Sequence, residues 1–388
     1  MYQNFLDRKF LLKTLTELVQ IDSTNPSCTP DGAGETEIAQ YISICLKDIG
    51  LDVETYEPEP GRMNVLGILS GEDQGRSLMF NAHMDTVGVV GMENPFAAQV
   101  HDGKMYGRGT QDMKASLAAS ITAVKALVDS NTRLPGDLFL AAVADEEYLS
   151  LGTSDLLKHC IPDAAIVTEP TNMQIALAHR GWAWLEVETF GIAAHGSRYQ
   201  DGVDANMRMG RVLNKLEGLE VDLRHHDPHV LVGTPSLHAA KIKGGTEWSI
   251  YADHCQLQIE RRTIPGESQE DILKEIQEIL DELKGIDEAF KAQLKLKAIR
   301  RPHEVSPEVD IVKSLQAASR SVLHEEPLLI GVPFWTDAAL MSAIGIDTVL
   351  ISPIGAGLHS KEEWVDLESV FHLAHILAKT AVMYNHQE

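Results

Sequence analysis

Short apolar segments that end in polar residues recur along the first half of the chain. They are NVLGIL, SLMFNAH, DLFLAAVADEE and AAIVTEP, and the segment MKASLAASITAVKALVDS between two of them has the composition and period of a helix. Alternating strands and helices predict an α/β domain with a largely parallel sheet. Ligands of such sheets bind at the carboxyl ends of the strands. The polar residues at those ends are therefore candidate site residues: His83, Glu146, Glu147 and Glu169.

The middle of the chain departs from this pattern. Two long strand-like segments, IALAHRGWAWLEVETFG and DHCQLQIERRTIPGE, are each followed by a helix-like segment. The α/β pattern then resumes and ends in a helix that begins near residue 367. We therefore expect a discontinuous catalytic domain, residues 1–176 and 299–388, with a small α+β domain inserted at residues 177–298.

Composition excludes several kinds of partner. The 388 residues include 57 acidic and 33 basic ones, a formal net charge of −24, whereas nucleic acid or an anionic membrane calls for a basic face. No segment reaches the roughly 18 apolar residues of a membrane helix. The first twenty residues, interrupted by Lys13 and Glu17, fit an amphipathic helix better than a signal peptide. Four scattered cysteines without a CxxC pair indicate reduced thiols in a cytoplasmic protein.

The segment NAHMDTVG places His83 and Asp85 two residues apart where an apolar run ends. Residues two apart in a strand point to the same face. A metal-binding imidazole is commonly held by such a carboxylate. Ordinary loop residues would give the same pattern, so these two residues alone leave both interpretations open.

Two further segments add metal-ligand types. GRGTQDMK places Asp112 in a glycine-rich turn before a helix, and GLHSKEEWV places His359 in a loop after a strand. With His83, Glu147 and Glu169 they make two imidazoles and three carboxylates, a set that suits a pair of zinc-like ions. Each motif alone also fits a solvated acid pair or a helix cap. Their joint occurrence at strand ends favours the metal site.

The ordered set of motifs resembles a known family. HMDTV, GRGTQDMK, ADEE, VTEPT, AAHGSR, IERRTIPGE and GLHSKEEWV are similar to those of the dizinc aminoacylase family of metallopeptidases. That family includes acetylornithine deacetylase, succinyl-diaminopimelate desuccinylase and bacterial glutamate carboxypeptidase. The resemblance extends from about residue 23 to the last helix, and it implies a zinc-peptidase-like catalytic domain with a mainly parallel mixed sheet.

The resemblance also implies roles for the site residues. His83 and Glu169 would hold one zinc ion, Glu147 and His359 would hold the other, Asp112 would bridge the two, Glu146 would be the general base, and Asp85 would orient His83. The neighbouring glutamates can divide these tasks because adjacent side chains diverge. The peptide bond after the bridging aspartate is often cis in the family, and the sequence leaves that open for Asp112–Met113.

The inserted domain resembles the family's lid, through which two chains form a homodimer. His195 matches a residue that reaches the partner's active site and stabilises the oxyanion. Arg262 matches an arginine that binds the substrate carboxylate, while we expect its neighbour Arg261 on the surface. Ser249 stands where the family frequently has a substrate-contacting asparagine, and Ala252 replaces a proline. The lid's contacts with substrate are therefore expected to differ.

These expectations converge on a cytoplasmic, metal-dependent amidohydrolase that removes an acyl group from an N-acyl-amino acid, a small-molecule substrate. The working metal would be zinc, although cobalt and manganese share its ligands. A dipeptidase or carboxypeptidase of the same family is the alternative. A non-enzymatic ligand-binding relative is a remote one, since all five metal-ligand candidates and Glu146 are present.

Overall fold

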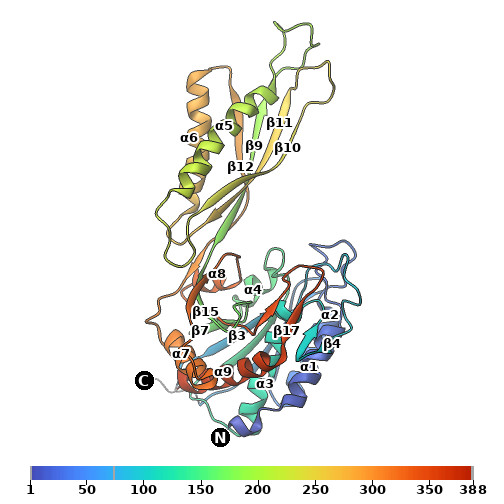
Figure 1. The fold of residues 1–388 in the computed structure, drawn as a ribbon, viewed down its shortest axis with the longest axis vertical. Coiled ribbons are helices and arrows are strands. Elements are labelled where there is room, and N and C mark those ends of the chain that lie inside the picture. The colour runs from blue at the N-terminus through green and yellow to red at the C-terminus, as the bar shows by residue number, and fades with distance from the viewer. Residues whose placement is uncertain (1, 73–74, 386–388) are drawn as a thin grey trace. The chain divides into compact units, whose positions relative to one another are not determined.

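The computed structural model describes residues 2–72 and 75–385 of the chain (Figure 1). Contacts divide the chain into two compact units. Unit 1 comprises Met1–Leu177, Val305–Ile330 and Thr336–Glu388, and unit 2 comprises Ala178–Glu304 and Gly331–Trp335. Among the described residues, no helix has both the length and the apolar character needed to cross a membrane.

Among the described residues, the large sheet has nine strands in the order β1-β2-β6-β3-β7-β15-β8-β13, with β14 beside β8. The neighbours β6, β3, β7 and β15 run parallel, and antiparallel strands flank them. The prediction of an α/β fold with a mainly parallel mixed sheet is confirmed. The strands are β1 (Asp52–Glu59), β2 (Arg62–Leu69), β3 (Leu78–His83), β6 (Leu138–Val143), β7 (Ala164–Val167), β8 (Ile175–His179), β13 (His303–Glu304), β14 (Leu329–Val332) and β15 (Asp347–Leu350).

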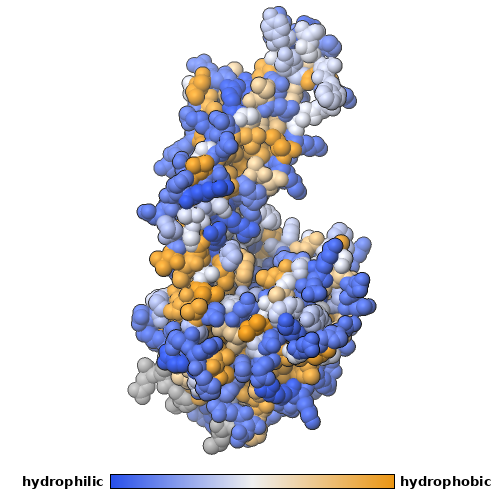
Figure 2. All heavy atoms as spheres, in the orientation of Figure 1, coloured by the Kyte–Doolittle hydropathy of each residue, from blue (hydrophilic) through white to orange (hydrophobic). Residues whose placement is uncertain are grey.

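Helices cover this sheet, which explains why its parallel strands are apolar runs. Every residue of β3 and β7 is buried, and α3 packs on α9 while both contact β3 (Figure 1). The helices of unit 1 are α1 (Arg8–Gln20), α2 (Thr36–Ile49), α3 (Ala115–Asp129), α4 (Leu151–Leu156), α7 (Asp310–Leu323), α8 (Ala338–Ser342) and α9 (Leu367–Asn385), with a short 3-10 turn at Tyr2–Phe5. On the face in view in Figure 2, hydrophilic side chains cover most of the surface of unit 1.

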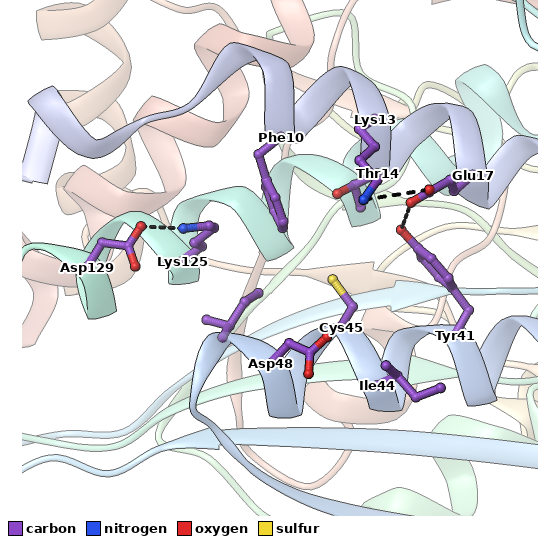
Figure 3. Close-up of a pocket in the computed structure, with 11 residues that line it drawn as sticks. Phe10, Lys13, Thr14, Glu17, Tyr41, Ile44, Cys45, Asp48, Lys125 and Asp129 are labelled. Carbon is purple, nitrogen blue, oxygen red and sulfur yellow. Dashed lines mark hydrogen bonds and ion pairs between the residues drawn. The ribbon is translucent and has the colours of Figure 1, made fainter.

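Helix α1 is amphipathic, as its sequence predicts, and buries Leu11, Leu15 and Leu18. Together with α2 and α3 it borders a hollow of about 300 Å³ (Figure 3). Cys45 of α2 lines this hollow, and the Tyr41 hydroxyl donates to Glu17 at 2.8 Å across it. The cysteines at positions 28, 45, 160 and 255 are free thiols.

A small sheet brings two distant motifs together. Its order is β16-β17-β5-β4, with strands β4 (Gln99–His101), β5 (Lys104–Tyr106), β16 (Gly355–Ala356) and β17 (Trp364–Asp366). Because Tyr106 pairs with Trp364, the turn after β5 lies beside the loop before β17. That turn, Thr110–Lys114, leads into α3 and contains a cis peptide bond between Asp112 and Met113.

Unit 2 is an antiparallel sheet covered on one face by two helices (Figure 1). The strand order is β10-β11-β9-β12, and the core between sheet and helices includes Val187, Leu257 and Ile276. Helix α6 begins with a capping box formed by Ser268 and Asp271. The elements are β9 (Gly181–Phe190), α5 (Ala205–Arg224), β10 (Ser236–Gly244), β11 (His254–Thr263), α6 (Gln269–Ile286) and β12 (Lys291–Arg300).

Two details of unit 2 differ from the sequence prediction. The segment expected to be one long strand is two, because β8 ends at His179 and β9 begins at Gly181. Strands β10 and β12 were not predicted. Both are edge strands with many exposed or half-exposed residues, so neither has the apolar run that marks a buried strand.

Candidate metal centre

Three neighbouring parallel strands deliver acidic and imidazole side chains to one edge of the large sheet. His83 is the last residue of β3, Glu146 and Glu147 follow β6, and Glu169 follows β7. Because β6, β3 and β7 are parallel neighbours, their carboxyl ends meet at the same edge. The local fold therefore follows from the apolar runs that precede each polar residue.

Asp112 lies between the two imidazoles. Its Oδ1 is 2.9 Å from His83 Nε2, and its Oδ2 is 3.3 Å from His359 Nε2. The same imidazole nitrogens approach one further carboxylate each, Glu169 at 3.6 Å from His83 and Glu147 at 3.1 Å from His359. The structure thus brings together all five metal-ligand candidates, with one carboxylate shared between two imidazole–carboxylate pairs.

The donor atoms are close enough to share cations. One ligand atom from each of His83, Asp112 and Glu147 lies within 4.8 Å of the others, and the same holds for His83, Glu146 and Glu169. Among the described residues, Glu169 Oε1 is buried without a hydrogen-bond partner. A buried carboxylate oxygen of that kind is costly unless a cation or donor meets it. The donor set and this unsatisfied oxygen fit divalent metal ions.

The pKa shifts in the cluster also fit a site for divalent metal ions. Burial raises the pKa of the Glu146 and Glu169 carboxyls well above their usual range, and neighbouring carboxylates add to the rise. The hydrogen bond with Asp112, supported by Glu147, raises the pKa of His359 to about 10. The rise at His359, and the smaller part of the rise at the two glutamates, reflects an excess of negative charge that attracts protons. Divalent cations would supply the missing positive charge.

Asp85 supports the cluster in two ways. Its backbone carbonyl accepts a hydrogen bond from His83 Nδ1 at 2.9 Å, whereas its carboxylate is 3.6 Å from that nitrogen. The carboxylate instead accepts the backbone N–H groups of Glu146 and Glu147, at 3.1 and 3.2 Å, and the side-chain amide of Asn25 at 2.7 Å. Asp85 therefore links the imidazole to the turn that carries both glutamates.

Sequence reasoning did not single out several residues that support the site. They are Asn25, Glu35, Arg62, Arg108 and Glu363. Asp337, the residue before α8, makes no side-chain cap hydrogen bond. Its carboxylate accepts from the Thr153 hydroxyl at 2.6 Å, and its Oδ1 is buried without a hydrogen-bond partner among the described residues. Glu363 lies inside the motif GLHSKEEWV, so that motif carried a signal for it, and Asn25 lies where the region of family resemblance begins.

Of the three candidate residues in unit 2, His195 and Ser249 lie in loops and Arg262 lies on strand β11. His195 is exposed, and its Nδ1 is 2.8 Å from the Ser197 hydroxyl. The backbone N–H of Gly196, the next residue, donates to the Ser249 carbonyl at 2.7 Å. Arg262 on β11 pairs with Glu260 at 3.0 Å. These contacts place His195 beside Ser249, and the roles of all three toward a substrate stay predictions.

The expectation that Arg261 lies on the surface is wrong. Its side chain is fully buried and pairs with Glu267 and Glu275. The alternation of β11 explains the burial, because Arg261 shares the inward face with Leu257 and Ile259.

A family profile identifies the chain. The profile of the Peptidase family M20/M25/M40 matches residues 79–383, well over half of the sequence. The chain belongs to this family. The resemblance to the dizinc aminoacylase family of metallopeptidases is thereby confirmed, and so is the prediction of a hydrolase that acts on amide bonds with metal ions.

Relatives of known activity cover almost the whole chain. An N-formyl-4-amino-5-aminomethyl-2-methylpyrimidine deformylase of Bacillus subtilis is 27% identical over 93% of this chain and 93% of its own length. An acetylornithine deacetylase of Myxococcus xanthus is 27% identical over 96% of this chain and 97% of its own. The crystal structure of a tripeptidase from Staphylococcus aureus superposes with a TM-score of 0.81, covers 99% of this chain and all of that chain, and is 21% identical. That structure shows a shared fold.

Proposed function

We propose that this chain is a metal-dependent amidohydrolase that removes an acyl group from an N-acyl-amino acid. The observation that carries the proposal is that His83, Asp112, Glu147, Glu169 and His359 lie together at the carboxyl ends of the strands, with Glu146 beside His83 and Glu169. The deacetylase and deformylase relatives both act, by their names, on an N-acyl or N-formyl bond. A linear amide on a small molecule is therefore the substrate class.

The proposed ligand division follows the contacts. His83 and Glu169 would hold one zinc ion, His359 and Glu147 the other, and Asp112 would contact both, since its two oxygens face different imidazoles. When bound, two such cations polarise a carbonyl and lower the pKa of water. Zinc fits the imidazole and carboxylate donors, and cobalt or manganese would use the same ligands. Metal analysis of the purified protein identifies the native ion.

Glu146 would act as the general base. Its carboxylate would take a proton from the attacking water, whose oxygen bonds to the acyl carbon, and would pass that proton to the leaving nitrogen as the C–N bond breaks. The products are a carboxylic acid and an amine. The Asp85 carboxylate accepts the backbone N–H of Glu146 at 3.1 Å, and the Asp85 carbonyl accepts from His83 Nδ1 at 2.9 Å, so Asp85 would support the base through its side chain and the imidazole through its backbone.

Unit 2 would supply the substrate contacts and the homodimer interface. The exposed His195 would donate to the oxyanion in the partner's site, and Arg262 would bind the substrate carboxylate through its fork of donors. Ser249, whose backbone is tied to the segment of His195, would contact substrate beside it. Without substrate, the guanidinium of Arg262 pairs with Glu260 at 3.0 Å.

A peptidase is the second candidate. The fold is shared with a tripeptidase, and the metal-ligand motifs do not report what lies beyond the scissile carbonyl. Hydrolysis by a deacylase should not depend on a free α-amine on the acyl side of the substrate, whereas hydrolysis by a dipeptidase should require one.

One experiment separates these candidates. The zinc-loaded protein is assayed against N-acetyl- and N-succinyl-amino acids, an N-formylated aminopyrimidine and unblocked di- and tripeptides, with a chelated sample and Glu146→Gln as controls. Chelator-sensitive cleavage of the acylated set alone supports the deacylase. Cleavage of unblocked peptides alone assigns a peptidase. No hydrolysis of any compound by protein with two bound metal ions contradicts both.

A further inference from the structure

Asp145, the residue before Glu146, has an unusual backbone that the surrounding side chains hold in place. Its φ is 68°, a left-handed conformation that residues with a side chain rarely adopt without support. The backbone N–H of Asp145 donates to Glu35 Oε1 at 3.3 Å, and Oδ2 accepts the N–H groups of Leu149 and Leu151 at 3.4 and 3.3 Å. The turn that aims Glu146 is thus fixed from both sides.

Arg62 connects the two carboxylates on which this turn depends. Its Nε and one terminal nitrogen donate to Glu35 at 2.8 and 2.7 Å, and the same terminal nitrogen donates to Asp145 Oδ1 at 2.8 Å. The side chains of Arg62, Glu35 and Asp145 are 7%, 0% and 4% exposed. Removing one member of a buried ion pair leaves the charge of the other uncompensated, which is strongly destabilising. Each of these three side chains therefore depends on the other two to stay in place.

Asn25 joins this group to the metal centre. Its amide donates to Asp145 Oδ1 at 3.1 Å and to Asp85 Oδ2 at 2.7 Å. Asp85 in turn accepts the backbone N–H groups of Glu146 and Glu147. A continuous set of hydrogen bonds therefore leads from Arg62 to the backbone of the proposed base.

We propose that Glu35 and Arg62 are positioning residues that fix the turn at Asp145 and thereby orient the Glu146 carboxylate. In the part of the chain that the structure describes, their side chains hydrogen-bond to each other, to Ser27 and to Asp145, and not to a metal-ligand candidate or to Glu146. Their effect passes through Asp145 and Asn25. The inference rests on the proposed role of Glu146 as the base, and the alternative is that the pair only holds α2 against β2.

A double-mutant cycle distinguishes these two roles, because an effect transmitted through Glu146 disappears once the base is gone. Arg62→Met keeps the length of the side chain but removes its donors. Alone, it is expected to lower kcat about 10- to 100-fold, since a misplaced base loses that much, with KM within about twofold and the bound metal content unchanged. In the Glu146→Gln background, the same substitution is expected to change the residual kcat less than about twofold.

Glu35→Gln repeats the cycle should Arg62→Met fail to fold. Glu275→Gln is the matched control, because it removes a carboxylate partner from the buried Arg261 of unit 2, and its kcat should stay within about twofold of wild type.

Equal loss of kcat in both backgrounds, loss of metal, or failure of both Arg62→Met and Glu35→Gln to fold would overturn the positioning role while leaving the proposed function intact. Full activity of Glu146→Gln alone would instead refute the proposed base, and the positioning role with it.

Discussion

Glu363 holds the backbone that carries Asp112. Its Oε1 accepts the N–H groups of Gln111 at 2.8 Å and Asp112 at 3.1 Å, while Oε2 accepts the N–H of Gly109 at 3.1 Å. Arg108 donates to Oε2 at 2.6 Å and neutralises the buried charge. The glutamate therefore shapes the turn that delivers the carboxylate shared by both imidazoles.

Glu363→Gln is expected to weaken metal binding about 10- to 100-fold, as loss of an outer contact to a ligand commonly does. A glutamine amide would face donors where the carboxylate had accepted, so at least one backbone bond must break. Competition with a chromogenic chelator measures the affinity. Glu362→Gln is the control because Glu362 is the exposed neighbour, and equal affinities for the two variants would contradict the role of Glu363.

His359→Ala is expected to remove one equivalent of metal and leave the other in place. Among the described residues, the His359 imidazole pairs with Asp112 and Glu147, whereas Glu169 pairs with His83. Elemental analysis after dialysis gives the metal content per chain, with His372→Ala, on α9, as the control. Loss of both equivalents together would contradict the proposed division of ligands.

The strand-end part of the site could be predicted because its sequence signal is local. The apolar runs before His83, Glu146 and Glu169 identify buried strands, and a general property of parallel sheets brings their carboxyl ends together. Glu35 and Arg62 carry no such signal, because the sequence does not distinguish a buried charged residue from a solvent-exposed one. Only tertiary packing brings Arg62 to Asp145, 83 positions away in the sequence.

The alternation of residues along a strand explains why the burial of Arg261 could have been predicted and why strand β10 could not. The buried residues of β11 alternate from Cys255 through Leu257 and Ile259 to Arg261, so period two already placed Arg261 on the core face. The edge strand β10 is mostly exposed, and its register shifts between Ala239 and Lys241, so it has no continuous apolar alternation by which to identify it. The motif IERRTIPGE contains Arg261, but the resemblance gave a role only to its neighbour Arg262.

Ile276→Ala should destabilise unit 2 by about 2–5 kcal/mol, since it removes a fully buried side chain from the core and leaves a cavity. Ile286→Ala on the same helix α6 is the matched control because Ile286 is 72% exposed, and it should change stability by less than about 0.5 kcal/mol. Urea unfolding followed by circular dichroism measures both. Similar midpoints for the two variants would contradict the packing of α6 on this sheet.

Alkylation of Cys45 should be slow at pH 8 and should accelerate in Asp48→Asn. Burial raises the pKa of the Cys45 thiol to about 11, and the charges of Asp48 and Glu17 add to the rise. The reactive thiolate is then only about 0.1% of the population at pH 8. Removing the Asp48 charge lowers that pKa and increases the thiolate fraction.

Peptide-resolved mass spectrometry after iodoacetamide treatment measures the rate at Cys45 across pH. Glu37→Gln, on the same helix α2 but outside the hollow of Figure 3, serves as the control. A rate at Cys45 that is equal in Asp48→Asn and the wild type would show that the carboxylate does not act on this thiol.

His195→Ala should abolish turnover, yet mixing it with Glu146→Ala should restore part of it. If His195 acts in the partner's site, a mixed dimer contains one site with both an intact Glu146 and an intact His195. Random exchange makes half of the dimers mixed, so activity should recover to about one quarter of wild type. Each variant alone, taken through the same exchange, is the control, and light scattering verifies the dimer. Absence of recovery after demonstrated subunit exchange would place the function of His195 within its own chain or remove it from catalysis.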